Sequence, residues 1–318
     1  MTTPVAVLFR AGLVLALAAS AGAAESVTTA DVAGWRSIWN GKDLTGWDTY
    51  MVNPPDKAWD VPGLKRDDLG NYTEGIGKNR DPLKVFTLEV ADGHPQIHVS
   101  GQGFGVMMTT EVFRDFRLRV EVKWGEKKWS KKAALPRDAG LLYFCFDEPP
   151  AVDRTWPRGI EFQIQEHDIG DLFALGTQIT VPARTGPGPA GRAPLHYYDP
   201  LGEPTDFKQV PPVGNRCIKL VDAEKPNGEW NQLELVCLGG DSIHIVNGKV
   251  VMRLHRAQKI AGPGAPGPLT EGKIALQTEG AEVYYRDVQV RPITAIPAEY
   301  AEPAAPTAPA PAAAPAAK

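Results

Sequence analysis

The stretch that decides the fold reads Phe116-Arg117-Leu118-Arg119-Val120-Glu121-Val122-Lys123-Trp124. Apolar and charged side chains alternate over its whole length, so in an extended chain the two kinds lie on opposite faces. This period of two predicts a strand with one face in a core and the other towards solvent or a groove. Helical periodicity is nearly absent from the rest of the chain.

Further strand-like runs follow on both sides, separated at short intervals by Gly, Pro and Asn. Asn247-Gly248 supplies the pair of positive φ angles that a type I′ hairpin turn requires. Two segments rich in Gly and Pro, Pro182–Gly191 and Gly262–Pro268, are expected to be long loops, and residues 182–212 either frame a site or form a plain insertion. The pattern predicts an all-β sandwich or jelly roll. The expected strands are Val85–Val90, Gln96–Val99, Gly140–Phe146, Gly159–Gln165, Cys217–Val221, Asn231–Leu238, Ser242–Val246, Lys249–Arg253, Gly272–Gln277 and Val283–Val290.

Both ends of the chain are expected to lie outside this domain. Arg10, the apolar run 11–19 and the small residues 20–24 have the organisation of a secretory signal over residues 1–24. The apolar run is too short for a membrane span. Residues 298–318 consist almost entirely of Ala and Pro, which predicts an extended, solvated tail. We therefore expect an exported protein, located in the periplasm or outside the cell.

Charge and cysteine content exclude some classes of function. The net charge of −4 and the pI near 5.9 provide no basic field for nucleic acid. Cys145, Cys217 and Cys237 are an odd number for an exported protein, so at most one disulfide can form, and we expect all three to be small buried hydrophobic residues.

The strand that ends in Glu166 is the main candidate for chemistry. Glu161, Gln163 and Gln165 would share one face, an unusual row for plain solvent exposure. Strict alternation points Glu166 the other way, but a one-residue bulge would bring it back, so that two carboxylates could flank one ligand. The catalytic candidates are therefore Glu161, Gln163 and Glu166. The alternatives are a polar face that binds sugar without cutting it, or a solvated strand.

Other residues are candidates for substrate binding. Some stand at strand mouths or strand ends, where close backbone approach is possible, and others pair aromatic rings with cations, a common way to hold a sugar. Turn and core roles are the competing interpretations. The candidates are Asp138, Tyr143, Gln165, Trp124, Lys123, Gln277 and Glu279.

His167 is the candidate metal ligand. It stands among Glu166, Asp168 and Asp171, so imidazole and carboxylates could hold a divalent ion. Neither an H-x-H nor an H-E-x-x-H motif supports this site. A divalent metal is thus the one cofactor that we consider.

Several segments, taken in order, resemble the 3-keto-disaccharide hydrolase domain family across Trp35–Pro292. They are Ser37–Trp47, Thr109–Trp124, Trp156–Gln165, Glu229–Asn231, Gly272–Gln277 and Tyr285–Val288. The resemblance implies a concanavalin A-like jelly-roll β-sandwich of two antiparallel sheets, export in bacteria, and action on glycosides oxidised at sugar C3. It also marks Asp138, Gly140, Glu161, Gln163 and Gln277 as family positions.

Two positions depart from the family pattern. Phe144 stands where a polar residue, often His, is expected, and Glu279 stands where many members have His. Each departure replaces a residue that could serve as a metal ligand or a base of the family type.

The function that follows is cleavage of a 3-keto-glycoside by removal of the C2 proton, elimination and addition of water. Glu161 or Glu166 would be the base, and Gln163 would stabilise the enolate. One alternative is a retaining glycosidase on unoxidised glucans, because E-x-Q-x-x-E is similar to the E-x-D-x-x-E strand of laminarinase-type enzymes. Another is a non-catalytic carbohydrate-binding module. All three predict a carbohydrate partner, and none predicts the oligomeric state.

Overall fold

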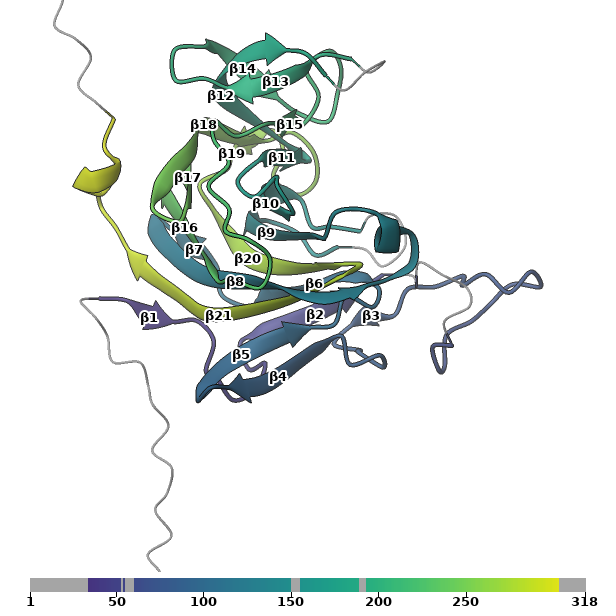
Figure 1. Ribbon diagram of the computed structural model, residues 1–318. Helices are drawn as coiled ribbons and strands as arrows, with labels where there is room; N and C mark the ends of the chain where they lie inside the picture. Colours follow the sequence, from purple (N-terminus) through teal and green to yellow (C-terminus); the bar gives the residue numbers. More distant parts are fainter. Residues whose placement is uncertain (1–33, 53, 55–59, 150–154, 189–192, 303–318) are drawn as a thin grey trace, which may run out of the picture.

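The computed structural model describes residues 34–52, 54, 60–149, 155–188 and 193–302, which form two large antiparallel sheets packed face to face (Figure 1). The predicted all-β, concanavalin A-like jelly roll is confirmed. The predicted secretory signal over residues 1–24 lies outside the described residues. Among the residues that are described, no helix is long and apolar enough to cross a membrane.

The larger sheet has twelve strands. Its spatial order is β13 (Leu195–Tyr198), β12 (Thr177–Gly186), β18 (Lys249–Lys259), β17 (Asp241–Val246), β16 (Asn231–Leu238), β8 (Phe116–Lys128), β21 (Ala281–Pro292), β5 (His94–Val99) and β4 (Phe86–Ala91). Three further strands pair at its margins: β1 (Arg36–Ser37) with β21, β14 (Glu203–Phe207) with β12, and β19 (Gly267–Pro268) with β18.

The smaller sheet has nine strands. Its order is β15 (Arg216–Cys217), β11 (Leu172–Leu175), β10 (Gly159–Gln165), β9 (Asp138–Cys145), β20 (Glu271–Glu279), β6 (Phe104–Thr109), β2 (Trp47–Met51) and β3 (Gly77–Lys78), with β7 (Phe113–Arg114) paired to β20. Two short 3-10 helices complete the described fold, η1 (Ser130–Ala134) and η2 (Ala298–Tyr300).

The predicted alternation of β8 is confirmed. Its apolar residues from Phe116 to Trp124 are buried, and the charged residues between them are partly exposed on the outer face of the larger sheet. On that outer face the Arg117 guanidinium lies 5.5 Å from the ring centroid of Trp35 and 5.0 Å from that of Tyr300. Arg117 also donates to Glu234.

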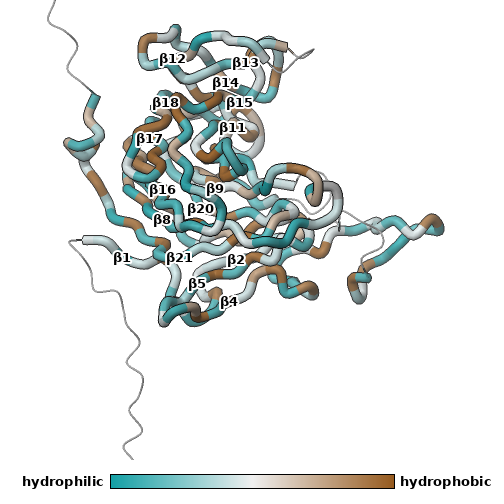
Figure 2. The backbone as a smooth tube through the Cα atoms, viewed as in Figure 1, coloured by the Kyte–Doolittle hydropathy of each residue, from teal (hydrophilic) through white to brown (hydrophobic). Residues whose placement is uncertain are grey.

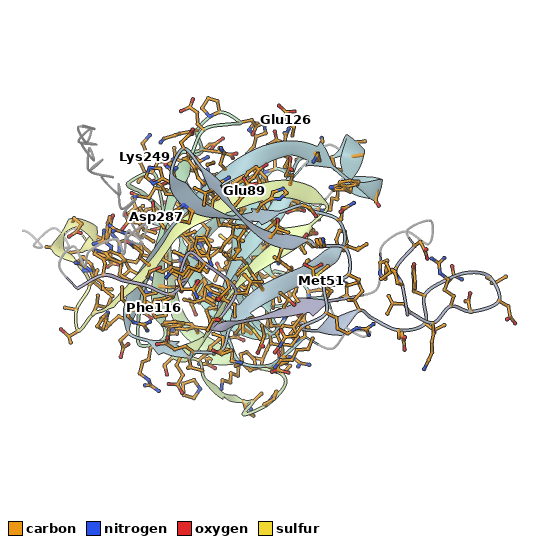
Figure 3. All side chains as sticks on the ribbon, turned by 90° about the horizontal axis from the view of Figure 1, so that it is seen from below. Met51, Glu89, Phe116, Glu126, Lys249 and Asp287 are labelled. Atoms are coloured by element: carbon orange, nitrogen blue, oxygen red, sulfur yellow. The ribbon has the colours of Figure 1, made fainter. Side chains whose placement is uncertain are left out.

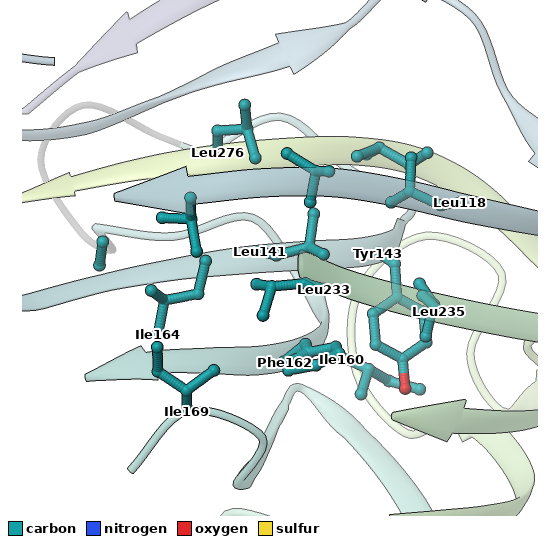
Figure 4. Packing of buried hydrophobic residues seen from close by; sticks show 14 of the residues in the cluster. Leu118, Leu141, Tyr143, Ile160, Phe162, Ile164, Ile169, Leu233, Leu235 and Leu276 are labelled. Carbon is teal, nitrogen blue, oxygen red and sulfur yellow. The ribbon is translucent and has the colours of Figure 1, made fainter. Parts of the chain in front are cut away.

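The core lies between the two sheets. Leu118, Leu233 and Leu235 of the larger sheet face Leu141 and Phe162 of the smaller one (Figure 4). Burying each such side chain stabilises the fold by about 1.5–3 kcal/mol. Figure 3, which draws every described side chain, shows the space between the sheets filled by side chains.

The predicted hairpin is confirmed. Asn247 and Gly248 have φ angles of 49° and 78°, as a type I′ turn requires, and join β17 to β18. Figure 2 shows hydrophobic stretches along both strands. The three cysteines are buried and free, as expected for small hydrophobic residues.

Three predictions need correction. The segment 182–212 is not one long loop, because it contains the end of β12 and all of β13 and β14; Pro182 pairs opposite Pro204 near the margin of the sheet, where a missing N–H is tolerated. The strand predicted over Cys217–Val221 contains only Cys217, the end of β15. The solvated tail begins later than Ala298, because η2 buries Tyr300 against Arg117; residues 303–318 lie outside the described part.

Candidate functional site

The smaller sheet carries a polar group of residues on the face that points away from the core. In the β9–β10 pairing, Gln163 stands opposite Gly140 and Gln165 opposite Asp138, without a register shift. Because side chains alternate along a strand, these residues share their face with Glu161, whereas Phe162 and Ile164 point into the core.

The neighbouring strand β20 adds two members to the same face, Gln277 and Glu279. Gly140 lies where β9 faces both Glu161 and Gln277. A Cβ atom at position 140 would stand 2.5 Å from Gln277 Oε1 and 2.7 Å from Glu161 Oε1, closer than real Cβ contacts come. The missing side chain therefore lets a carboxyl and an amide from two strands converge.

A lysine completes the site from outside the sheet. Lys132, on η1, donates to Asp138, and its Nζ lies 3.1 Å from Glu279 Oε1. The chain around η1 is fixed to the sheet because the Trp129 N–H donates to the Gly280 carbonyl at 2.9 Å. We call Lys132, Asp138, Glu161, Gln277 and Glu279 the acidic cluster.

Sequence analysis missed Lys132. It lies in a short irregular segment with no periodicity, and its partners are six and 147 residues away along the chain, as the numbers of Asp138 and Glu279 show. The sole local signal was its proximity to Trp129 and the cations that precede it.

Burial controls the protonation of the cluster. Burial, together with the negative charges of Glu279 and Asp138, raises the pKa of Glu161 well above its usual value. Burial and the Asp138 charge likewise raise the pKa of Glu279 to about 7, despite the nearby Lys132. Burial also raises the pKa of Asp138, against the opposing effects of Lys132 and Gln165. Burial therefore favours the protonated form of Glu161, and Glu279 titrates near neutral pH.

Some polar atoms of the cluster lack partners. The two amide atoms of Gln277 and Asp138 Oδ1 are buried and make no hydrogen bond of normal geometry to a described residue, although the Glu161 carboxyl lies beside the amide. Such groups cost about 1–3 kcal/mol each when nothing satisfies them. They mark the place where a ligand group or a water would be held.

The other predicted residues of β10 support the cluster. Gln165 Nε2 donates to Asp138 Oδ2 at 2.9 Å and so fixes that carboxylate. Gln163 is buried on the same face, and its Oε1 accepts from the Ile164 N–H at 2.8 Å. The structure thus brings together six predicted residues: Asp138, Glu161, Gln163, Gln165, Gln277 and Glu279.

Residues 34–291 match the domain family described as 3-keto-alpha-glucoside-1,2-lyase-like. The chain belongs to this family. No curated protein matches the chain.

Solved structures resemble the 3-keto-alpha-glucoside-1,2-lyase-like domain in fold. A protein from Parabacteroides distasonis, provisionally assigned as a glycosyl hydrolase, is 20% identical, with a TM-score of 0.45 over 82% of this chain and 94% of that one. LamAcat from Zobellia galactanivorans is 13% identical, with a TM-score of 0.37 over 78% and 92% of the two chains. A carbohydrate-binding module from Bacillus subtilis is 10% identical, with a TM-score of 0.36 over 65% and 91%.

Glu166 does not join the acidic cluster of this domain. The predicted bulge is absent, and the Glu166 N–H continues the ladder by donating to the Arg137 carbonyl. Its carboxylate accepts from the Arg137 N–H and Nη1, each at 2.9 Å, and from Asn227. Partial burial acts to raise the pKa of Glu166, but these donors outweigh it and the pKa is lowered. Glu166 is therefore an ionised partner of Arg137.

The surroundings of His167 do not fit a metal site. His167 is exposed on the turn after β10, and Arg216 binds both Asp168 and Asp171. In the described part of the domain, no group of three or more His, Cys, Asp or Glu residues is arranged to hold a metal ion.

Three predicted binding residues lie elsewhere. Tyr143 is in the core, where its hydroxyl is 2.7 Å from Ser242 Oγ and 3.0 Å from His244 Nε2 (Figure 4). Trp124 is buried in the larger sheet, and Lys123 Nζ lies over the Trp230 ring, 4.8 Å from its centroid, on the outer face of that sheet. The structure does not bring these three residues to the acidic cluster.

Proposed function

We propose that this domain cleaves glycosides of sugars oxidised at C3, and that the acidic cluster is its catalytic centre. The observation that carries the proposal is that two carboxyl groups, Glu161 and Glu279, share one polar sheet face with the Lys132 ammonium. Glu161 has a pKa raised well above its usual value, and the pKa of Glu279 is raised to about 7. Carboxyl groups with raised pKa values can take or give a proton near neutral pH, as the base and acid of a reaction must.

Glu279 is the base in this proposal. A base works best when its pKa lies near the operating pH, and the Glu279 side chain retains 19% exposure, so a ligand can reach it. The ketone at C3 acidifies the C2 proton, which Glu279 removes. The electron pair of the C2–H bond then forms the C2–C3 double bond, and the ketone oxygen becomes an enolate.

Lys132 and Glu161 support the charge that develops. The Lys132 ammonium, beside Glu279, is the cation available for the enolate oxygen, and the amides of Gln163 and Gln277 are available to orient the sugar. The enolate re-forms the ketone, a double bond forms between C1 and C2, and the anomeric C–O bond breaks. Protonated Glu161 gives its proton to the departing oxygen. Water adds to C1 of the resulting enone and gives its proton to Glu161, while Glu279 returns its proton to C2; this yields the free 3-keto sugar and restores both carboxyl groups.

This assignment differs from the base expected from sequence. The raised pKa of Glu161 favours its protonated form and Glu166 is paired with Arg137, so neither is the base in this proposal. The same ion pair also speaks against a retaining glycosidase that uses Glu161 and Glu166 as its two carboxylates. No step in the proposal needs a metal.

A 3-keto-disaccharide assay tests the proposal. Purified protein should release the second sugar from the 3-keto substrate and leave the unoxidised disaccharide intact. Glu279→Gln should lower kcat by about 10²–10⁴-fold, the usual contribution of a general base. Glu166→Gln is the matched control, because it removes a carboxylate of the same sheet outside the cluster. Wild-type turnover by Glu279→Gln, or turnover of the unoxidised disaccharide, would refute the proposed mechanism.

We further propose that the protein is exported, on the basis of the signal-like sequence of residues 1–24. Cell fractionation should recover a shortened chain outside the cytoplasm. A full-length chain in the cytoplasmic fraction would contradict this proposal.

A further inference from the structure

A recess of about 290 Å³ lies at the other end of β20 from Glu279. The ends of β9 and β18 and the start of β20 form its walls. Lys273 stands four residues before Gln277 on β20 and therefore on the same face of the sheet, about 13 Å along the strand. The recess is thus separate from the acidic cluster.

Two lysines of the recess make no direct ion pair with a described residue, although the charge of Lys273 helps to lower the pKa values of Asp48 and Glu148. Lys259 and Lys273 both line it, and neither ammonium group makes an ion pair or a hydrogen bond to any residue that the structure describes. Lys259 Nζ lies 5.0 Å from the ring centroid of Phe146, which holds the charge above the wall of the recess. Both side chains are partly buried.

The acidic residues of the recess are already neutralised by cations outside it. Asp147 accepts from Arg158, Glu148 Oε1 lies 2.8 Å from Lys78 Nζ, and Glu271 Oε2 lies 3.0 Å from Arg114 Nη2. Each carboxylate therefore has a cation in contact, although Lys78 Nζ is shared with Asp48, whose Oδ2 lies 3.1 Å away. With Lys259 and Lys273 included, five cations stand against four carboxylates, so one positive charge is in surplus.

One wall is suited to a small ring. Gly272 lets β20 approach β9 closely at this end, because a Cβ there would stand 2.3 Å from the Phe144 carbonyl carbon. Val112, half-exposed, provides an apolar wall beside Phe146. The volume is close to the lower limit of ordinary small-molecule sites, about 300 Å³.

We propose that this recess binds a sugar that carries an oxyanion. Lys259 and Lys273 hold the charged group, a carboxylate or a phosphate, and the ring packs against Phe146 and Val112. Two ammonium groups that lack direct partners favour an anion. Charge-assisted hydrogen bonds to the anion then replace the hydrogen bonds that the ammonium groups and the anion each make to water. The inference is independent of the proposed reaction.

Calorimetry on the full-length protein at low salt tests the site with four probes: glucuronate, glucose 6-phosphate, glucose and inorganic phosphate. At least one of the two sugar anions should bind saturably and at least about tenfold more tightly than glucose, with affinity that falls as salt rises. A preference for glucuronate identifies a carboxylate site, and a preference for glucose 6-phosphate identifies a phosphate site.

Variants locate the binding. The double variant Lys259→Gln/Lys273→Gln should weaken the sugar anion at least about tenfold, whereas Lys273→Arg should retain most of the affinity. Lys249→Gln is the matched control, since Lys249 is exposed on the β17–β18 hairpin (Figure 3) and should change nothing. Equal affinity for glucose and the sugar anions, or unchanged binding by the double variant, would overturn the proposal. Inorganic phosphate that binds as tightly as the sugar anions would overturn the role of the ring.

Discussion

Lys132 Nζ lies 3.1 Å from Glu279 Oε1, and this contact joins the short helix η1 to the end of β20. The same ammonium group donates to Asp138 on β9. One lysine from outside the sheet therefore links carboxylates of two adjacent strands, beside a third carboxyl, Glu161, whose pKa is raised by burial. Protonation within the cluster consequently depends on whether η1 holds its place.

Removal of this lysine should change the pH dependence of activity. Lys132→Met leaves Asp138 and Glu279 without their cation, so the pKa of Glu279 should rise further and the pH at which activity reaches half its maximum should move up. Lys132→Arg should restore most of the profile. Measurement of kcat/KM against pH for the three proteins checks this, with Lys249→Met as the control; an unchanged profile in Lys132→Met would contradict it.

Glu279 should make the fold less stable as pH rises. Its pKa is raised from 4.5 to about 7 in the folded protein, so the folded state binds more protons than the unfolded state between these values. Stability contributed by protonated Glu279 is then full below pH about 4.5 and is lost as pH rises to about 7, a change of about 1–3 kcal/mol. Urea unfolding at pH 5 and pH 7.5 should show a smaller loss in Glu279→Gln than in wild type. Equal losses would show that Glu279 does not titrate in this range.

A methyl group at position 140 should close the site. The Cβ of Gly140→Ala would meet Gln277 Oε1 at 2.5 Å and Glu161 Oε1 at 2.7 Å, so one of the two side chains must move. We expect loss of most activity and a destabilisation of about 1–3 kcal/mol. Gly240→Ala is the control, because its Cβ would meet Ala257 N at 3.3 Å, away from the cluster. Full activity in Gly140→Ala would show that the convergence is not needed.

Glu166→Gln should affect stability and leave activity within about twofold of wild type. The depressed pKa of Glu166 contributes stability that is present above its ordinary pKa and is lost as pH falls through the lower, folded value. Loss of the pairing with Arg137 should cost about 1 kcal/mol at neutral pH, and less at acid pH. Thermal unfolding together with the 3-keto-disaccharide assay measures both; a large loss of kcat would return Glu166 to the catalytic centre.

Tyr143→Phe should destabilise the core without a change in KM. The variant leaves Ser242 Oγ and His244 Nε2 without the hydroxyl that each contacts, which costs about 1–3 kcal/mol. Burial lowers the pKa of His244 to about 4, so this histidine is neutral at pH 7 and its ring keeps one nitrogen that needs a donor. Urea unfolding and steady-state kinetics give the two quantities. A raised KM would indicate that Tyr143 contacts the substrate after all.

Local patterns predicted the parts of the fold that depend on neighbours in sequence. The alternation along β8, the Asn247-Gly248 turn and the shared face of Glu161 and Gln165 all follow from a period of two or from one dipeptide. The strands β12 to β14 were missed because Pro and Gly in the segment indicate loops, and the strands form only by pairing with one another and with β18.

The parts of the site that sequence could not provide are all long-range. Lys132 reaches Glu279 across 147 positions of the numbering, and Glu166 is held by Arg137 and Asn227, which are 29 and 61 residues away. No periodicity encodes such contacts. The bulge proposed near Glu166 was inferred from the local sequence. The direction of this carboxylate is instead determined by its tertiary partners.

The contacts of Arg117 bring the two ends of the domain together. Trp35, near the first described residue, and Tyr300, near the last, both pack on the same guanidinium, and the two ends leave the body on the same side (Figure 1). Ends this close can be joined by a short linker, and the chain can then be opened at an exposed turn such as Asn247-Gly248. The domain is therefore well suited to circular permutation and to insertion into another protein.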